Sequence, residues 1–168
     1  RDTIKLFATA VEALEAEGVS DPGAHLVWIR SWNTATVGVR RAPLTKGQIN
    51  AATDFCEERG FDLCHVPGLS RDRVNRFMIL PQPVYYEAAQ ALLGEERSAF
   101  YKESLFYLRP ATDDSPYFSR FFKWTAIKRL FEGMGSEWIP FVEWGYLALL
   151  VTLGQAVAAA VVCILAPL

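Results

Sequence analysis

The chain has 168 residues, of which 51% are hydrophobic, and its formal net charge is −2. All 17 Lys and Arg and all 19 Asp and Glu residues lie at or before Glu143, so residues 144–168 carry no charge. Such high apolar content at so low a net charge excludes a disordered chain, and the near balance of charges gives no support for nucleic-acid binding. The uneven distribution excludes a uniformly soluble globule and also a polytopic membrane protein over this span.

The first part of the chain carries alternating helix and strand signals. Apolar side chains at helical spacing predict a helix over residues 3–17. Two β-rich runs follow, residues 25–32 and 34–40. They predict either a hairpin that turns at Asn33 or one bent strand, and the hairpin is favoured.

A second helix and a third strand complete this part. Thr45 and Gln48 fit a capping box, in which a hydroxyl and an amide three residues on satisfy each other's backbone donors. The helix that they start is predicted to end at Gly60, and residues 61–66 predict a short strand. The alternation favours an α/β layer structure for residues 1–68.

Residues 69–137 are predicted to form a helical and loop segment. Helices are expected over residues 84–93 and 95–102, and a short extended run over residues 105–108. An amphipathic helix is expected over residues 124–131, where apolar side chains recur at helical spacing.

The uncharged end of the chain is predicted to be a transmembrane helix within residues 138–168. Residues 144–165 would rise about 33 Å as a helix, against about 30 Å of bilayer hydrocarbon. Trp138 and Tyr146 mark its edge, where aromatic rings favour the interface. The Lys and Arg residues before it predict that residues 1–137 lie on the cytoplasmic side of a bacterial inner membrane. A buried core helix is the alternative.

The cysteines and histidines predict no metal site. Cys56, Cys64 and Cys163 form no CxxC pair, and His25 and His65 lack ligand-like spacing to them. Three small buried thiols are expected instead.

The candidate substrate loop consists of Thr112, Asp113, Asp114 and Tyr117. Adjacent carboxylates on an extended chain point in different directions. One of them would then face a cavity and attract a cationic group, while the other caps backbone donors. The alternative is a simple Asx-type turn that begins a loop. No phosphate-binding or hydrolase motif accompanies the loop, so no catalytic residue is assigned.

Three further segments are candidate parts of a site. Residues 75–77 and 83–87 form an aromatic and polar cluster, for which helix packing is the alternative. Residues 31–34 follow a predicted strand, at the kind of position where open α/β sheets place ligands.

Several segments together resemble bacterial spermidine synthase-like integral membrane proteins, often described as S-adenosylmethionine-dependent methyltransferases. The resemblance rests on Arg109-Pro110-Ala111-Thr112-Asp113-Asp114-Ser115-Pro116-Tyr117-Phe118, with residues 83–89, 143–147, 2–7 and 44–45 in support. A Thr-Asp-Asp-x-Pro segment recurs in that group near the end of the cytoplasmic domain. Ser115 departs from the usual Thr-Asp-Asp-Arg-Pro form, which removes a charge that would pair with the carboxylates.

The resemblance implies the C-terminal part of a Rossmann-like, class I methyltransferase-like domain, followed by a loop-rich α segment and one transmembrane helix. It also implies S-adenosylmethionine, or its decarboxylated form, as cofactor, with the cofactor-binding residues expected before Arg1. We therefore expect an internal piece of a longer protein. The implied partners are the lipid bilayer, other transmembrane helices of the full-length chain and a small cationic acceptor.

The first functional hypothesis is a fragment of a membrane-anchored transferase that moves a methyl or aminopropyl group to an amine-like acceptor. The second is a non-catalytic, membrane-bound Rossmann-like module for binding or scaffolding. A third is an independent soluble domain with a hydrophobic tail anchor.

Overall fold

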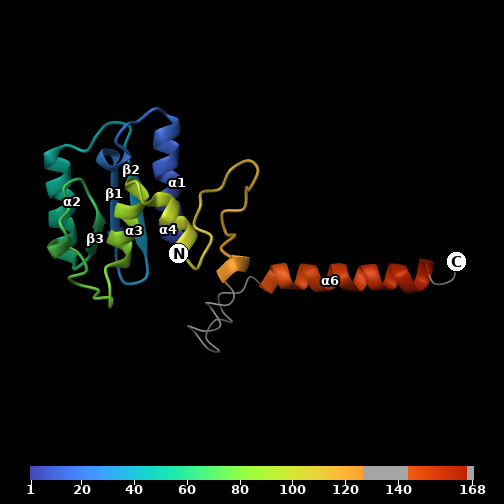
Figure 1. Cartoon of the computed structure of the whole chain (residues 1–168). Coiled ribbons are helices and arrows are strands. Elements are labelled where there is room, and N and C mark those ends of the chain that lie inside the picture. The colour runs from blue at the N-terminus through green and yellow to red at the C-terminus, as the bar shows by residue number, and fades with distance from the viewer. Residues whose placement is uncertain (127–143, 166–168) are drawn as a thin grey trace. The chain divides into compact units, whose positions relative to one another are not determined.

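The computed structural model describes residues 1–126 and 144–165. Contacts divide the chain into two compact units, Arg1–Ser119 and Arg120–Leu168. The first unit holds the sheet and four of the described α-helices, and the second holds α6 (Figure 1). The division of the chain at residues 68 and 137 remains a prediction.

The described sheet has three strands, β1 (Leu26–Arg30), β2 (Ala35–Val39) and β3 (Asp62–His65), in the order β2-β1-β3. β1 is antiparallel to both neighbours. The β1–β2 hairpin is confirmed, and the backbone N–H of Ser31 donates to the carbonyl of Thr34 at 2.8 Å to close it.

The predicted Rossmann-like fold is wrong. A Rossmann sheet is mostly parallel, and its neighbouring strands are joined by helical crossovers. Here the four residues 31–34 join β1 to β2, and this short connection lets the two strands pair only antiparallel. The helix α2 joins β2 to β3, but these strands lie on opposite sides of β1. Residues 1–126 therefore contain a small mixed α/β domain with an antiparallel sheet.

The helix α1 (Asp2–Ala16) covers one face of the sheet and confirms the first predicted helix. Phe7 on α1 stacks on Trp28 of β1, with ring centroids 4.7 Å apart. Both side chains are fully buried, so this aromatic pair forms the centre of the core on that face. The chain leaves the helix through Gly18, whose φ of 84° is a conformation that favours glycine.

The helix α2 (Lys46–Arg59) covers the other face and has the predicted capping box. The side chain of Thr45 accepts the N–H of Gln48, and the Gln48 side chain accepts the N–H of Thr45. Gly60 ends the helix in the left-handed conformation. Cys56 on α2 packs with Leu63, which pairs with Ile29 and so lies on the face opposite Trp28.

Two short helices, α3 (Val84–Leu93) and α4 (Arg97–Glu103), follow the sheet and confirm the expected helices in this region. Contacts join α3 to α1, to β3 and to α4. The extended run predicted over residues 105–108 is irregular in the structure. The helix predicted over residues 124–131 is described only at Trp124–Ala126, as a 3₁₀ turn, and its remainder lies outside the described residues.

The strand β3 contains a bulge opposite β1. Trp28 pairs with His65 and Ile29 with Leu63, so Cys64 has no counterpart on β1. The extra residue shifts the alternation of side chains along β3. As a result Asp62 and His65, which are three residues apart, both lie on the face that carries Trp28.

The predicted transmembrane helix is wrong, together with the assignment of residues 1–137 to the cytoplasmic side of a bacterial inner membrane. The helix α6 (Trp144–Ala160) has 17 residues, and a π-helical segment (Val161–Leu165) follows it. At about 1.5 Å per residue, α6 rises about 26 Å, short of the roughly 30 Å of bilayer hydrocarbon. Across residues 1–126 and 144–165, no helix has both the length and the apolar character to cross a membrane. The predicted edge residue Trp138 lies outside these ranges.

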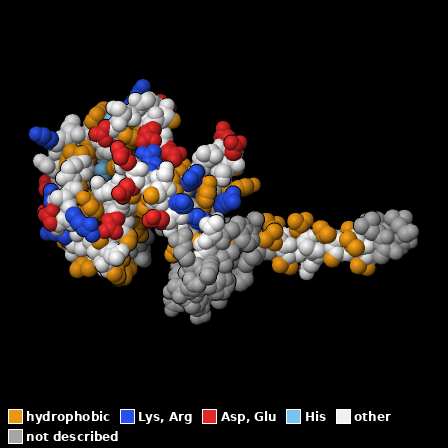
Figure 2. Space-filling view, viewed as in Figure 1, with side chains coloured by type: hydrophobic (Ala, Val, Ile, Leu, Met, Phe, Trp, Pro, Cys, Tyr) orange, Lys and Arg blue, Asp and Glu red, His pale blue; other side chains and the backbone are white. Residues whose placement is uncertain are grey.

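Charge distinguishes the described surface of Arg1–Ser119 from that of α6 (Figure 2). Acidic and basic side chains alternate over the visible face of Arg1–Ser119. Apolar side chains line α6, where Leu149, Val151 and Leu153 are exposed.

Candidate functional site

The candidate substrate loop forms a tight exposed turn. The N–H of Ser115 donates to the carbonyl of Thr112 at 2.9 Å, and the N–H of Thr112 donates back to Ser115 at 3.3 Å. Asp113 and Asp114 occupy the exposed tip of this turn. Backbone hydrogen bonds thus close this turn, and both a role in substrate binding and the Asx-type turn remain predictions.

The two aromatic residues after this turn separate. Tyr117 is 76% exposed. Phe118 lies beside Lys5 of α1, whose Nζ is 5.4 Å from the Phe118 ring centroid and 5.3 Å from that of Tyr107. Lys5 is fully buried, so this contact ties the end of the loop to α1.

A cleft of about 440 Å³ lies among α1, α3 and α4. Most of its wall is apolar or aromatic and comes from Ile4, Tyr85, Ala88, Phe100, Phe106 and neighbouring side chains. A volume of this size falls within the range of small-molecule sites, about 300–1,000 Å³. None of the four residues of the candidate substrate loop lines it.

Two charged side chains, Arg1 and Glu103, line the same cleft. The Arg1 guanidinium carbon lies 5.8 Å from the centroid of the Phe106 ring. Cations are attracted to the negative face of an aromatic ring within about 6 Å. An aromatic wall of the cleft therefore already holds a cation from the chain itself.

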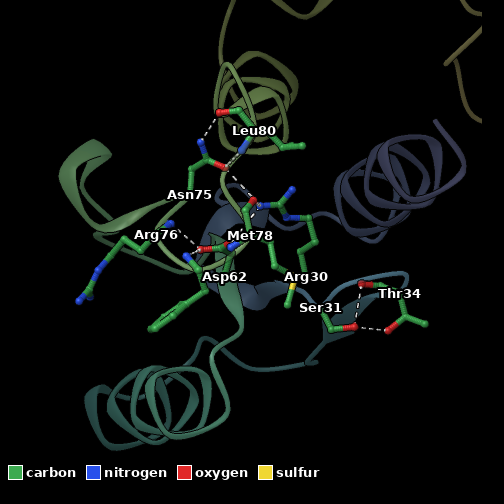
Figure 3. Close-up of polar contacts among 9 residues, drawn as sticks. Arg30, Ser31, Thr34, Asp62, Asn75, Arg76, Met78 and Leu80 are labelled. Atoms are coloured by element: carbon green, nitrogen blue, oxygen red, sulfur yellow. Dashed lines mark hydrogen bonds and ion pairs between the residues drawn. The ribbon is translucent and has the colours of Figure 1, made fainter.

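A polar centre that was not predicted from the sequence lies at the end of β1, outside the cleft (Figure 3). Nη2 of Arg30 donates to the Asp62 carboxylate at 2.7 Å, to the carbonyl of Met78 at 2.5 Å and to the Asn75 side chain at 3.3 Å. The Arg30 and Asp62 side chains are 10% and 2% exposed.

Asp62 also organises the loop after β3. One carboxylate oxygen accepts the N–H groups of Arg76 and Phe77 at 2.7 and 3.0 Å, and the other accepts that of Met78 at 2.9 Å (Figure 3). Asn75, at φ 56°, exchanges hydrogen bonds with the backbone of Leu80. A single carboxylate thus fixes three consecutive backbone amides.

These contacts decide the protonation state of Asp62. Burial raises its pKa, but the N–H groups of Phe77, Met78 and Arg76 and the guanidinium of Arg30 together hold the pKa below its ordinary value. The group is therefore a carboxylate at neutral pH, fully engaged in hydrogen bonds. Its geometry suits a structural role better than proton transfer.

The thiols differ from the expectation of three buried cysteines. Cys56 and Cys64 are buried, whereas Cys163 is exposed. Burial raises the pKa of Cys56 to about 11 and that of Cys64 to about 12. Within residues 1–126 and 144–165 no group of His, Cys, Asp and Glu is placed to hold a metal ion.

Tyr85 belongs both to the cleft and to the polar centre at the end of β1. It lines the cleft, and it also lines a cavity of about 10 Å³ beside Arg30, Asp62 and Asn75. Asn75 and Tyr85 belong to the aromatic and polar cluster predicted from the sequence, whereas Arg30 and Asp62 were not predicted. Opposite charges at strand ends, 32 positions apart in the chain, were the available signal.

The cleft does not fit S-adenosylmethionine as class I methyltransferases bind it. Such sites have a glycine-rich turn after a strand and an acidic residue at the end of the next strand. The cleft has neither, because its charged residues come from helix ends.

Comparison with known proteins returned no matching protein-family model, no matching curated protein and no matching solved structure.

Proposed function

We propose that the Arg1–Ser119 unit binds a small organic amine in the cleft among α1, α3 and α4. In this proposal the cleft is the acceptor site of a transferase similar to spermidine synthases. The observation that carries the amine part is the Arg1 guanidinium over Phe106, inside a cleft that Glu103 also lines.

The chemistry of the wall favours a cation with an apolar stem. Aromatic rings supply apolar contact and an attractive face for positive charge. A carboxylate beside them supplies a charge-assisted acceptor for an ammonium N–H. A neutral ligand of the same shape would use only the first of these interactions.

The transferase part rests on the resemblance of residues 109–118 and their supporting segments. Under it the transferred group is methyl or aminopropyl, and the donor is S-adenosylmethionine or its decarboxylated form. Cofactor-binding residues are not assigned to the chain. A non-catalytic binding module is the second candidate, and it is favoured because Asp113 and Asp114 are exposed on a turn and do not line the cleft.

The test is a titration of the 168-residue chain with benzylamine, followed by calorimetry and by amide NMR. Benzyl alcohol is the uncharged control of nearly the same shape. We expect benzylamine to bind about tenfold more tightly, which corresponds to about 1.4 kcal/mol. Equal affinities would overturn the amine proposal.

Two variants localise the binding. Phe106→Leu and Glu103→Gln are expected to weaken benzylamine binding severalfold. The matched control is Phe77→Leu, because Arg76 lies over the Phe77 ring at 5.5 Å outside the cleft. Loss of binding in Phe77→Leu, with none in Phe106→Leu, would place the site elsewhere. A titration of the full-length protein with S-adenosylmethionine separates the two candidates, since only the transferase needs this donor.

A further inference from the structure

The inference concerns Arg30, a residue outside the cleft whose guanidinium packs against one of the cleft's walls. The guanidinium carbon lies 5.3 Å from the centroid of the Tyr85 ring. The same ring makes a T-shaped contact with Trp28, with ring centroids 5.5 Å apart and ring planes at 88°. Tyr85 is thus held by a cation and by an aromatic neighbour, both from β1.

Arg30 is itself fixed by the loop. Asp62, Asn75 and Met78 all accept from its Nη2, and Asp62 at the same time holds the amides of the loop (Figure 3). A buried guanidinium with three acceptors on one nitrogen has little freedom to rotate. Its plane therefore forms a stable surface for the Tyr85 ring.

We propose that Arg30 is a positioning residue, which holds the Tyr85 ring in the wall between the small cavity and the cleft. Its effect on ligand binding rests on the proposed function of the cleft, whereas its effect on the ring does not. Lysine cannot replace it fully, because a point charge lacks the planar face that a guanidinium presents to the Tyr85 ring.

The test compares Arg30→Lys and Arg30→Met with wild type in the 168-residue chain. The ring resonances of Tyr85, assigned with a Tyr85→Phe variant, report the ring without any ligand. We expect both Arg30 variants to shift these resonances, and Met to shift them more. The matched control is Arg71→Met, because Arg71 also pairs with α3, through Glu87 at 2.7 Å, but on the exposed surface.

Benzylamine affinity is then measured in the same set. We expect Arg30→Met to weaken binding about tenfold, Arg30→Lys to weaken it less, and Arg71→Met to leave it unchanged. Arg30→Lys keeps a cation beside Asp62, so it serves as the folded variant if the methionine substitution prevents folding. Unshifted Tyr85 resonances in a folded Arg30 variant would overturn the positioning role.

The outcomes separate this role from the function of the cleft. Shifted Tyr85 resonances with unchanged benzylamine affinity would overturn the link between the ring and the ligand. Failure of wild type to bind benzylamine would overturn the proposed function, while the ring resonances would still decide the role of Arg30.

Discussion

The Asp62 carboxylate and the Arg30 guanidinium form an ion pair of 2.7 Å between neighbouring strands, with side chains 2% and 10% exposed. Removing one member of such a pair leaves a buried charge without a partner, at a cost of about 3–5 kcal/mol. Asp62→Asn is therefore expected to lower the free energy of unfolding in urea by about this amount. The control is Glu57→Gln, whose pair with Arg76 is half exposed and is expected to contribute less than about 1 kcal/mol. Equal losses in the two variants would contradict a structural role for Asp62.

His65 is expected to make stability depend on pH. Burial lowers its pKa, against the smaller raising effects of its contact with the Gly23 carbonyl and of Asp21. The unfolded chain therefore binds a proton at a higher pH than the folded chain does. The contribution of His65 to the free energy of unfolding should be fully present above about pH 6.5, the ordinary pKa of histidine. It should be lost as the pH falls from there toward the lower pKa that His65 has in the folded state.

The measurement is the free energy of unfolding at several pH values between about 7.5 and 5, where a neutral His65→Gln variant should lose most of the slope. Asp62 acts in a separate window. Its pKa is lowered in the folded state, so its contribution is present above about pH 3.9 and is lost at lower pH. A wild-type slope in His65→Gln would assign the effect to another group.

The thiols should separate by reactivity. Cys56 and Cys64 are buried, with pKa values raised to about 11 and about 12, so both are protonated and shielded near neutral pH. Cys163 is exposed. A thiol reagent should label one cysteine of the native chain quickly and the other two only in denaturant. Rapid native labelling of all three would contradict the packing of α2 on β3, and a Cys163→Ser variant identifies the fast site.

Gly38 is expected to be intolerant of a methyl group. A Cβ at this position would lie 2.7 Å from Cγ1 of Val27 on the neighbouring strand, and β-branched valine has little freedom to move. Gly38→Ala should destabilise the domain by about 1–3 kcal/mol, as overpacking does. Gly47→Ala on α2 meets nothing within 4 Å and should stabilise the helix by about 0.5–1 kcal/mol. Adding Val27→Ala should recover part of the Gly38→Ala loss, and no recovery would point to a backbone effect instead.

Substitution of Asp113 and Asp114 tests the candidate substrate loop directly. Both side chains are exposed at the tip of a turn, so Asp113→Asn with Asp114→Asn should change the free energy of unfolding by less than about 0.5 kcal/mol. The loop hypothesis expects weaker acceptor binding in this double variant. Unchanged benzylamine affinity would remove the loop from the site and leave the cleft as its only candidate part.

Local signals predicted the local structure well. The capping box of Thr45 and Gln48, the end of α2 at Gly60 and the hairpin between β1 and β2 all depend on residues close together in the chain, and all three are confirmed. The wrong prediction of the sheet concerns contacts between residues that are far apart in the chain. Strand order depends on which strand β3 pairs with, and hydrophobic alternation carries no information about that choice.

The residues around Arg30 also divide into those that local sequence signals predicted and those that depend on distant contacts. Asn75 and Tyr85 stood out because polar and aromatic residues cluster there in the sequence. Arg30 and Asp62 did not, because each is an isolated charge in a β-rich run, and their partnership exists only once β1 and β3 lie side by side. Uncharged composition likewise suggested one long helix at the end of the chain, whereas the backbone changes from α to π geometry after Ala160.

The unpaired Cys64 in β3 determines how this strand tolerates insertions and deletions. With the extra residue present, Asp62 reaches Arg30 while His65 reaches Phe7 on the same face. Deleting Cys64 would leave Asp62 and His65 two residues apart, which in a regularly alternating strand again places both on that face. Pairing of Cys64 with β1 in a regular ladder would instead put Asp62 and His65 on opposite faces, and either the ion pair or the histidine contact would be lost. Both contacts of β3 therefore depend on Cys64 staying outside the ladder.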